Sequence, residues 1–393
     1  MSVGGQVGSD GVVTGLYGAE PPYDHGSVPA VGVLMVNLGT PDAPTAPALR
    51  RYLREFLSDP RVVEVPRWKW RLILNLFVLP FRPRRSAALY RKIWQDDGSP
   101  LLTGSLRLGA AVTDRLRRRV GSPLHLAVGM RYGRPSLRDA LAELREAGCT
   151  KLLVLPMFPQ YSGTTVGSVF DAVTAELSTW RAVPGLRTIH RYHDVPAYVE
   201  ALARTIREVW QRDGVSDRLL FSFHGVPLRY FTAGDPYHCE CLKTARLVAE
   251  ALELEEERWN VAFQSIFGKE EWIKPTTDVT IRAMATAGVR KLDVVCPGFA
   301  VDCLETLEEI DQLNHEHFLS NGGERFRYIP CLNDRPDHAD LLTDVIFDHL
   351  QGWVTVAEEW NAEAIQARAR DSMRRAEGLA ERGCPADAGY GLR

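Results

Sequence analysis

The strongest constraint on the fold is a pair of short apolar runs, each leading into a loop that carries a reactive side chain. Leu219 to Phe223 leads into His224, and Leu292 to Cys296 leads into a loop that reaches Glu305. Runs of this length are typical of strands buried on both faces of a parallel sheet. Ligands bind at the carboxyl ends of such strands. We therefore expect His224 and Glu305 to face each other across a cleft.

Strands and helices alternate along the chain. Apolar runs predict strands at residues 31–38, 124–129, 151–156, 186–191, 219–223, 260–264, 291–296 and 326–330. Periodicity and capping signals predict helices at residues 46–57, 136–147, 196–210, 241–254, 278–287 and 303–318. Ser136 and Asp139 form an imperfect capping box at the second of these helices. The alternation indicates an α/β fold with parallel sheets.

One sequence pattern occurs twice. Ala147-Gly148 followed by Lys151-Leu152 recurs at a constant offset as Ala287-Gly288 followed by Lys291-Leu292. Such self-similarity predicts two related domains that close on a cleft. We expect a disordered lead-in at residues 1–30, an N-terminal α/β domain at 31–195, a C-terminal α/β domain at 196–353 and a helical or loose tail at 354–393.

Composition excludes several classes of protein. A formal net charge of −3 over 393 residues gives no reason to expect a nucleic-acid partner. Seven cysteines, an odd number in a chain long enough for a large core, fit a reducing compartment better than a disulfide framework. Residues 1–30 contain no Lys or Arg, so they lack the basic region of a secretory signal. These features predict a cytoplasmic protein.

The segment at residues 66–85 combines apolar and basic side chains. Its apolar stretch, 72–81, follows Trp68 and Trp70 and has basic residues on both sides. The stretch is too short to span a bilayer as a helix, which takes about 20 residues. It fits a peripheral contact with a membrane interface, or the lip of a pocket for a flat apolar molecule. A buried helix with a solvated basic edge is an equally good interpretation.

The facing imidazole and carboxylate suggest a chemistry. His224 and Glu305 can exchange protons near neutral pH, and together they can bind a divalent metal. On an α-helix that starts near Cys303, Glu308 and Glu309 share a face with Glu305, and Asp311 shares one with Glu308. Such a row can relay protons or a cation. Alternatively, His224 only hydrogen-bonds its own loop, and the acidic residues form a solvated helix face.

Four cysteines lie close to these loops in sequence. They are Cys239, Cys241, Cys296 and Cys303. Four thiolates can hold an iron–sulfur cluster or zinc, but this spacing matches no standard ligand pattern. Free thiols near strand ends are the simpler interpretation.

Several motifs together resemble one family. In the second half they are Ser222-Phe223-His224-Gly225-Val226-Pro227, Gly234-Asp235-Pro236-Tyr237, Gln264-Ser265, and Asp302-Cys303-Leu304-Glu305-Thr306-Leu307-Glu308-Glu309. In the first half they are Val36-Asn37-Leu38-Gly39-Thr40-Pro41, Gly98-Ser99-Pro100, Arg131-Tyr132 and Tyr161-Ser162-Gly163-Thr164-Thr165. Taken in chain order, from about Val31 to Trp353, these motifs resemble those of ferrochelatase of the bacterial type.

The resemblance implies a lyase that inserts Fe²⁺ into protoporphyrin IX, with release of two protons, to form protohaem in the last step of haem biosynthesis. It implies two similar Rossmann-like domains, each a four-stranded parallel sheet flanked by helices, with the porphyrin between them. It makes His224 and Glu305 the catalytic pair and iron ligands, and residues 66–85 the pocket lip. The porphyrin-binding residues that it implies are Arg131, Tyr132, Tyr161, Trp272 and Phe299.

The chain departs from some relatives at two positions. Gly163 stands where the human type has a cluster cysteine, and Cys303 stands where some relatives have His. A [2Fe–2S] cluster on the four cysteines named above stays open at this point. So do coproporphyrin III as the substrate, a non-catalytic tetrapyrrole-binding protein on the same scaffold, and a chelatase for another tetrapyrrole.

Overall fold

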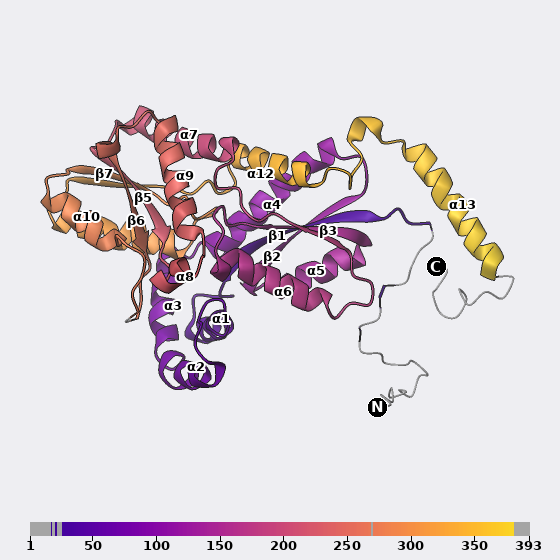
Figure 1. The fold of residues 1–393 in the computed structure, drawn as a ribbon, viewed down its shortest axis with the longest axis horizontal. Coiled ribbons are helices and arrows are strands. Elements are labelled where there is room, and N and C mark those ends of the chain that lie inside the picture. The colour runs from indigo at the N-terminus through magenta and orange to yellow at the C-terminus, as the bar shows by residue number, and fades with distance from the viewer. Residues whose placement is uncertain (1–16, 18–19, 22–25, 269, 381–393) are drawn as a thin grey trace.

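The chain forms two parallel β-sheets with the same strand order. The computed structural model describes residues 17, 20–21, 26–268 and 270–380 (Figure 1). The first sheet has the order β2-β1-β3-β4, and the second has the order β6-β5-β7-β8. The strands are β1 (Ala30–Thr40), β2 (Leu124–Gly133), β3 (Cys149–Pro156), β4 (Gly185–Thr188), β5 (Arg218–His224), β6 (Trp259–Gln264), β7 (Lys291–Val295) and β8 (Arg325–Ile329). This topology confirms the predicted fold of two similar α/β units.

The internal repeat coincides with equivalent strands of the two sheets. Lys151 lies in β3 and Lys291 begins β7, and each of these strands is third in its sheet. β3 pairs with the central strand β1, just as β7 pairs with β5. The conserved spacing therefore marks the same structural position in both halves.

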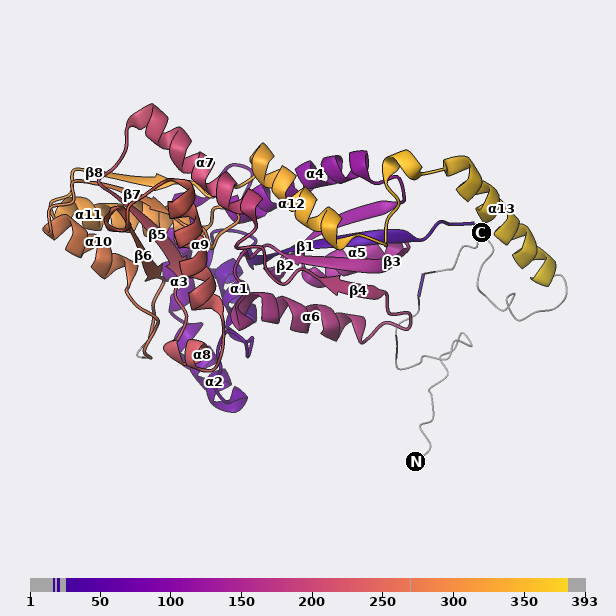
Figure 2. The ribbon, with the colours of Figure 1, turned by 45° about the horizontal axis from the view of Figure 1, so that its top comes forward.

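Helices cover both faces of each sheet (Figures 1 and 2). The longer ones that flank the strands are α4 (Pro100–Arg119), α5 (Leu137–Glu146), α6 (Ser168–Leu177), α7 (Pro196–Asp213), α9 (Tyr237–Ala251), α10 (Thr277–Thr286) and α12 (Pro336–His349). The remaining helices are α1 (Ala46–Leu57), α2 (Arg67–Ile73), α3 (Arg82–Ile93), α8 (Leu228–Thr232), α11 (His315–Ser320) and α13 (Ala362–Ala380). None of the described helices is long and apolar enough to cross a membrane.

Local sequence signals account for several element boundaries. The capping box at α5 is present, since the Ser136 hydroxyl accepts from the Asp139 N–H and the Asp139 carboxylate accepts from the Ser136 N–H. The strand expected at residues 186–191 ends earlier, at Thr188, because β4 is an edge strand that pairs with β3 only as far as Val154.

Two expectations need correction. The sequence patterns predicted no helix at residues 100–119, where α4 lies. Gly104 and Gly109 weaken its helical signal, and both are needed, because a Cβ at either position would lie within 2.5 Å of a valine side chain. The expected disorder of residues 1–30 does not hold at Glu20. Its carboxylate accepts hydrogen bonds from Arg145 and from the backbone of Arg181. The end of the predicted loose tail, with Cys384, lies outside the described residues.

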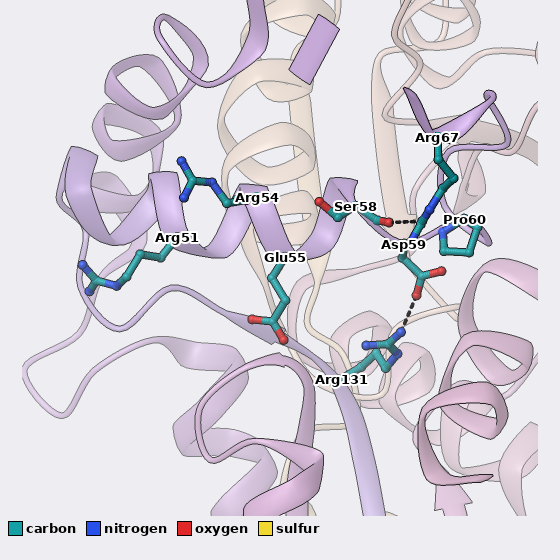
Figure 3. Close-up of a pocket in the computed structure, with 8 residues that line it drawn as sticks. All are labelled: Arg51, Arg54, Glu55, Ser58, Asp59, Pro60, Arg67 and Arg131. Carbon is teal, nitrogen blue, oxygen red and sulfur yellow. Dashed lines mark hydrogen bonds and ion pairs between the residues drawn. The ribbon is translucent and has the colours of Figure 1, made fainter. Parts of the chain in front are cut away.

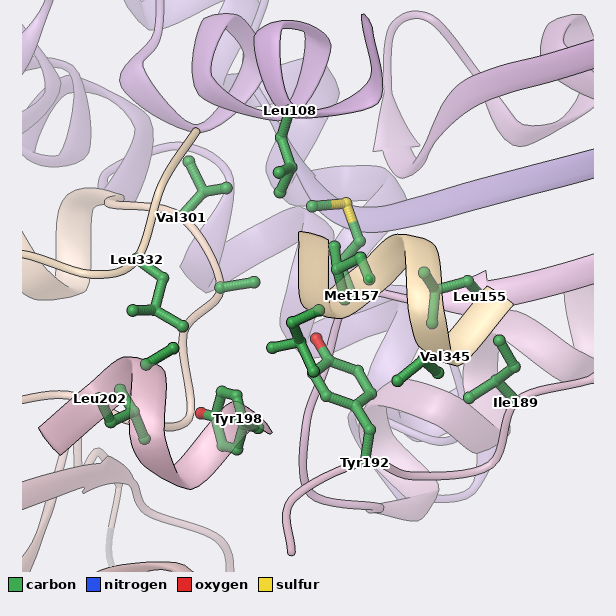
Figure 4. Close-up of a cluster of buried hydrophobic side chains, with 14 of the residues drawn as sticks. Leu108, Leu155, Met157, Ile189, Tyr192, Tyr198, Leu202, Val301, Leu332 and Val345 are labelled. Carbon is green, nitrogen blue, oxygen red and sulfur yellow. The ribbon is translucent and has the colours of Figure 1, made fainter. Parts of the chain in front are cut away.

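A shared apolar core joins the two halves. Leu108 of α4 and Leu155 of β3 pack in one cluster with Leu202 of α7, Val301 after β7 and Val345 of α12 (Figure 4). Helix α12 follows the second sheet in sequence but packs on α4, beside the first sheet. Ion pairs between Arg119 and Asp344 and between Arg115 and Asp340 flank this contact. The two sheets are therefore held in one arrangement.

This core yields a stability test on a single helix. Leu108 is fully buried between the halves, whereas Leu106, two residues earlier, is 44% exposed. We expect Leu108→Ala to lower the free energy of unfolding by about 2–5 kcal/mol, because it removes buried methyl groups and leaves a cavity. Leu106→Ala, the matched control, should change it by less than about 0.5 kcal/mol. Equal losses in urea titrations of the two variants would contradict the assignment of this core.

Candidate active site

The site forms at the carboxyl edge of the second sheet. His224 is the last residue of β5 and pairs in register with Gln264, the last residue of β6. Just beyond them, the Gly225 N–H donates to the Gln264 carbonyl over 2.8 Å. The loop after β7 reaches the same edge, where the Gln264 side chain donates to the backbone carbonyl of Glu305 over 2.7 Å. Gln264 therefore links the end of β5 to the loop that carries Glu305, and the facing of the two side chains stays a prediction.

The imidazole of His224 has a defined tautomer. Its Nδ1 lies 2.6 Å from the Gly225 carbonyl oxygen. Since a carbonyl only accepts, Nδ1 carries the hydrogen and Nε2 keeps its lone pair in the neutral ring. The bond to its own loop, foreseen as the structural alternative, thus prepares His224 to accept a proton or a metal at Nε2. The side chain is half-buried, so the site has an opening to solvent.

The helix that carries the carboxylates is not the expected α-helix. Residues Glu305–Asn314 form a π-helix, η4, before α11 begins at His315. Each π-helical hydrogen bond spans five residues instead of four, so positions i and i+4 share a face while i+3 turns away. The predicted common face of residues 305, 308 and 309 is therefore wrong for Glu308, and Glu305 and Glu309 point the same way.

Glu309 faces the reactive edge. Both of its carboxylate oxygens accept from Ser265, one from the backbone N–H over 2.7 Å and the other from the hydroxyl. Its pKa is raised, mainly because burial removes the carboxylate from water. The Ser265 hydrogen bonds and the electrostatic interaction with His224 oppose this rise, and the charge of Glu305 adds to it. His224, Glu305 and Glu309 therefore lie within electrostatic reach of one another.

The other two acidic residues lie elsewhere. Glu308 is buried and pairs with Lys92 of α3 over 2.8 Å, so its charge is compensated. Asp311 is exposed at the residue level, and desolvation of its carboxyl group raises its pKa. Among the described residues, no hydrogen bond or ion pair joins Glu308 or Asp311 to His224.

Residues from the first half complete the surroundings of Glu305. Tyr52 and Tyr90 are buried, and desolvation raises their pKa values, with a further increase from the Glu305 charge. Desolvation lowers the pKa of Arg82, and Glu305 partly offsets that shift. The sequence patterns missed these side chains and Lys92, because their contacts with the second half depend on how α1 and α3 pack.

The expected substrate residues fall into two groups. Trp272 and Phe299 lie in the second half, near the reactive edge. Trp272 is buried and pairs through its backbone with Pro227, in the loop after His224. Its indole N–H has no hydrogen-bond partner among the described residues. Phe299 is half-buried and packs against core residues on both faces of the second sheet.

The other group lies at the carboxyl edge of the first sheet. Arg131 pairs with Asp59, whose carboxylate also accepts from the hydroxyl of the buried Tyr132 over 2.8 Å. Arg131 lines a hollow beside α1 and points toward Asp59 (Figure 3). Tyr161 stacks on His190, with ring centroids 4.2 Å apart. In this conformation none of the three touches His224.

The cysteines form no evident metal centre. Cys241, Cys296 and Cys303 are buried, and desolvation raises their pKa values well above the ordinary range, while Cys239 is exposed. Protonated thiols are poor metal ligands. Within the described ranges, no group of three or more His, Cys, Asp or Glu side chains is arranged to hold a metal ion.

The raised pKa of Glu309 predicts a pH dependence of stability. An acid with a folded pKa above its unfolded value, here 4.5, loses its proton first in the unfolded chain. Stability is therefore lost as the pH rises from about 4.5 through the folded pKa, by about 1.4 kcal/mol per unit of pKa difference. We expect Glu309→Gln to remove this component, so that the variant gains stability relative to the parent as the pH rises. Chemical denaturation from pH 4 to 8 measures the difference.

An exposed glutamate supplies the control. Glu316→Gln, at an exposed position on α11, controls for the substitution of a glutamate by glutamine. A constant difference between Glu309→Gln and the parent over the whole range would contradict the raised pKa.

Known proteins match most of this chain. The ferrochelatase family model matches residues 30–350. A ferrochelatase of Nitrosococcus oceani is 55% identical, over 90% of this chain and 96% of the relative, and one of Thioalkalivibrio sulfidiphilus is 52% identical, over 92% and 98%. The structure of SirB from Bacillus subtilis with Fe³⁺ shares the fold, with a TM-score of 0.50, 9% identity, and coverage of 82% of this chain and 95% of that one. The chain belongs to the ferrochelatase family.

Proposed function

We propose that His224 and Glu305 are the metal ligands and catalytic pair with which this ferrochelatase inserts Fe²⁺ into protoporphyrin IX. Two pyrrole N–H bonds break as the iron binds the four ring nitrogens, so two protons leave for each Fe²⁺ that enters and the charge balances. The observation that carries the proposal is the convergence of the His224 imidazole, Glu305 and Glu309 at one sheet edge.

The environments of these groups suggest their roles. His224 offers the Nε2 lone pair, which suits both an iron ligand and a proton acceptor. Glu309 accepts hydrogen bonds from Ser265 at this edge, and because burial raises its pKa it is better suited to receive a proton than an ordinary carboxylate. In the proposal, protons or iron pass along Glu309, Glu308 and Asp311 between the reactive edge and solvent. Lys92 compensates the charge of Glu308, and Asp311 is exposed to solvent.

The apolar macrocycle of the porphyrin is proposed to pack against Trp272 and Phe299. The unpartnered indole N–H of Trp272 leaves a buried donor for a substrate acceptor. The porphyrin propionates are proposed to bind to Arg131, Tyr132 and Tyr161. A guanidinium such as that of Arg131 is a good bidentate partner for a carboxylate. Arg131 would then exchange Asp59 for the substrate carboxylate. The proposal includes no resident [2Fe–2S] cluster, because no three or more His, Cys, Asp or Glu side chains of the described residues are grouped to hold a metal.

We further propose that the lip, residues 66–85, makes a peripheral membrane contact. Six of its apolar side chains are exposed, while Leu74 and Leu79 are buried, which favours a surface segment over a buried helix. The exposed ones are Trp68, Leu72, Ile73, Leu76, Phe77 and Phe81. They lie on α2, on the π-helix η1 (Leu74–Val78) and just before α3, next to basic residues. This arrangement suits the interface between water and lipid.

The catalytic assignment is tested by His224→Ala. We expect metal insertion to fall at least about 100-fold, since a group that accepts protons in the reaction is lost, while porphyrin binding and the circular dichroism spectrum are retained. Anaerobic optical assays with protoporphyrin and Fe²⁺ measure the rate. His317→Ala, at a half-exposed position on α11, serves as the control. Ordinary turnover by His224→Ala would remove this residue from the mechanism.

The membrane contact is tested by changing the most exposed part of the lip. Leu76 and Phe77 are 60% and 67% exposed. We expect Leu76→Glu with Phe77→Glu to reduce co-sedimentation with phospholipid vesicles at least about tenfold, because two carboxylates would have to leave water. Val183→Glu changes a residue that is 62% exposed outside the lip and should bind like the parent. Equal binding by all three proteins would contradict the proposed contact.

A further inference from the structure

We propose that Gln264 is a positioning residue that sets the separation between His224 and Glu305. This inference rests on the proposed function of that pair. Gln264 touches neither reactive group itself. It connects the two loops on which they stand, and it does so from within the sheet.

Gln264 bonds to both loops. Its backbone carbonyl accepts a hydrogen bond of 2.8 Å from the N–H of Gly225, which is the residue after His224. Its side-chain Nε2 donates to the backbone carbonyl of Glu305 over 2.7 Å. Because Gln264 also pairs in register with His224 in the sheet, its main chain is fixed on one side and its side chain defines the distance to the other.

The side-chain amide can take only one orientation. Its Oε1 accepts from the Ser222 hydroxyl over 2.7 Å, and the Cys296 thiol approaches the same oxygen at 3.6 Å. Ser222 in turn lies 2.8 Å from the Thr277 hydroxyl. With Oε1 held by a donor, the NH₂ group must face Glu305, since a flipped amide would place an oxygen against that carbonyl. Gln264 is 2% exposed, so water does not replace a lost bond.

The next residue extends the same device to the second carboxylate. Ser265 has a φ of +63°, an unusual conformation for a residue other than glycine. It turns both its N–H and its hydroxyl toward Glu309. Two consecutive residues thus hold Glu305 through its backbone and Glu309 through its side chain. The strained turn occurs where the π-helix η4 must be placed against β5 and β6.

Catalysis is sensitive to such positioning. A displacement of about 1 Å at a reacting group can reduce a rate about 100-fold without affecting the binding of a large substrate surface. The porphyrin contacts proposed here, on Trp272 and Phe299, do not include Gln264. Loss of the Gln264 side-chain bonds should therefore lower kcat for metal insertion and leave KM for the porphyrin nearly unchanged.

Four variants test this. Gln264→Met keeps the length and removes both side-chain bonds, and Gln264→Glu keeps the acceptor but loses the donor to Glu305. We expect kcat to fall about 10- to 100-fold in both, with KM for protoporphyrin within about threefold of the parent. Ser222→Ala removes the hydroxyl that orients the amide and should lower kcat less, by about three- to tenfold. Combining Ser222→Ala with Gln264→Met should cost no more than Gln264→Met alone, since both act through one amide.

A distant buried hydroxyl provides the control for lost stability. Thr343 of α12 is 2% exposed and donates to the Ala339 carbonyl over 2.6 Å. Thr343→Val loses a buried hydrogen bond far from the site and should retain the kcat of the parent. Parent and His224→Ala rates, measured in the same series, show separately whether the catalytic assignment itself holds.

Three results would overturn the positioning role. They are a parental kcat in Gln264→Glu, a rise in KM that accounts for the whole loss, and multiplicative effects of Ser222→Ala and Gln264→Met. If Gln264→Met does not fold, Ser222→Ala decides alone, and a parental kcat in that variant also rejects the proposal.

Discussion

The apolar core shared by the two halves is the interaction on which the arrangement of the site depends. Side chains from both halves pack together in this core, among them Leu108, Leu155, Leu202, Val301 and Val345. Being apolar, they need no hydrogen-bond partners there. Apolar burial contributes about 25 cal/mol per Å², so a shared core of this extent makes independent movement of the halves expensive. The elements that carry the site residues therefore keep a fixed arrangement relative to one another.

Within that frame, differences in environment separate carboxylates that are close in sequence. Glu308 and Glu309 are neighbours on one helix, yet Glu308 is compensated by Lys92, while Glu309 receives hydrogen bonds from Ser265 and keeps a raised pKa. The π-helical geometry causes this division, because it turns position 308 away from the face shared by 305 and 309. Neighbouring carboxylates of one acidic run therefore have different partners, the Lys92 ammonium for Glu308 and Ser265 for Glu309.

The sequence predicted what depends on local signals. The eight strands and the cap at Ser136 follow from apolar runs and capping chemistry, and the roles of His224 and Glu305 stay predictions. It did not reveal α4, whose Gly104 and Gly109 look like helix breakers until the valines packed against them are known. Nor did it predict the π-helix at 305–314 or the contacts of Lys92 and Gln264, since these depend on tertiary packing between distant segments.

The repeat shows how two similar units acquired different chemistry. The equivalent strands β3 and β7 are each followed by π-helical backbone, at Gly163–Gly167 in the first half and at Glu305–Asn314 in the second. The first contains glycine, threonine and valine, while the second contains the acidic row. In the first half, Asp235 holds the Ser162 hydroxyl and the Gly163 N–H, so that element is fixed by a carboxylate from the other unit. The same backbone geometry thus occurs in an element that the other unit anchors in the first half and in the acidic element of the second half.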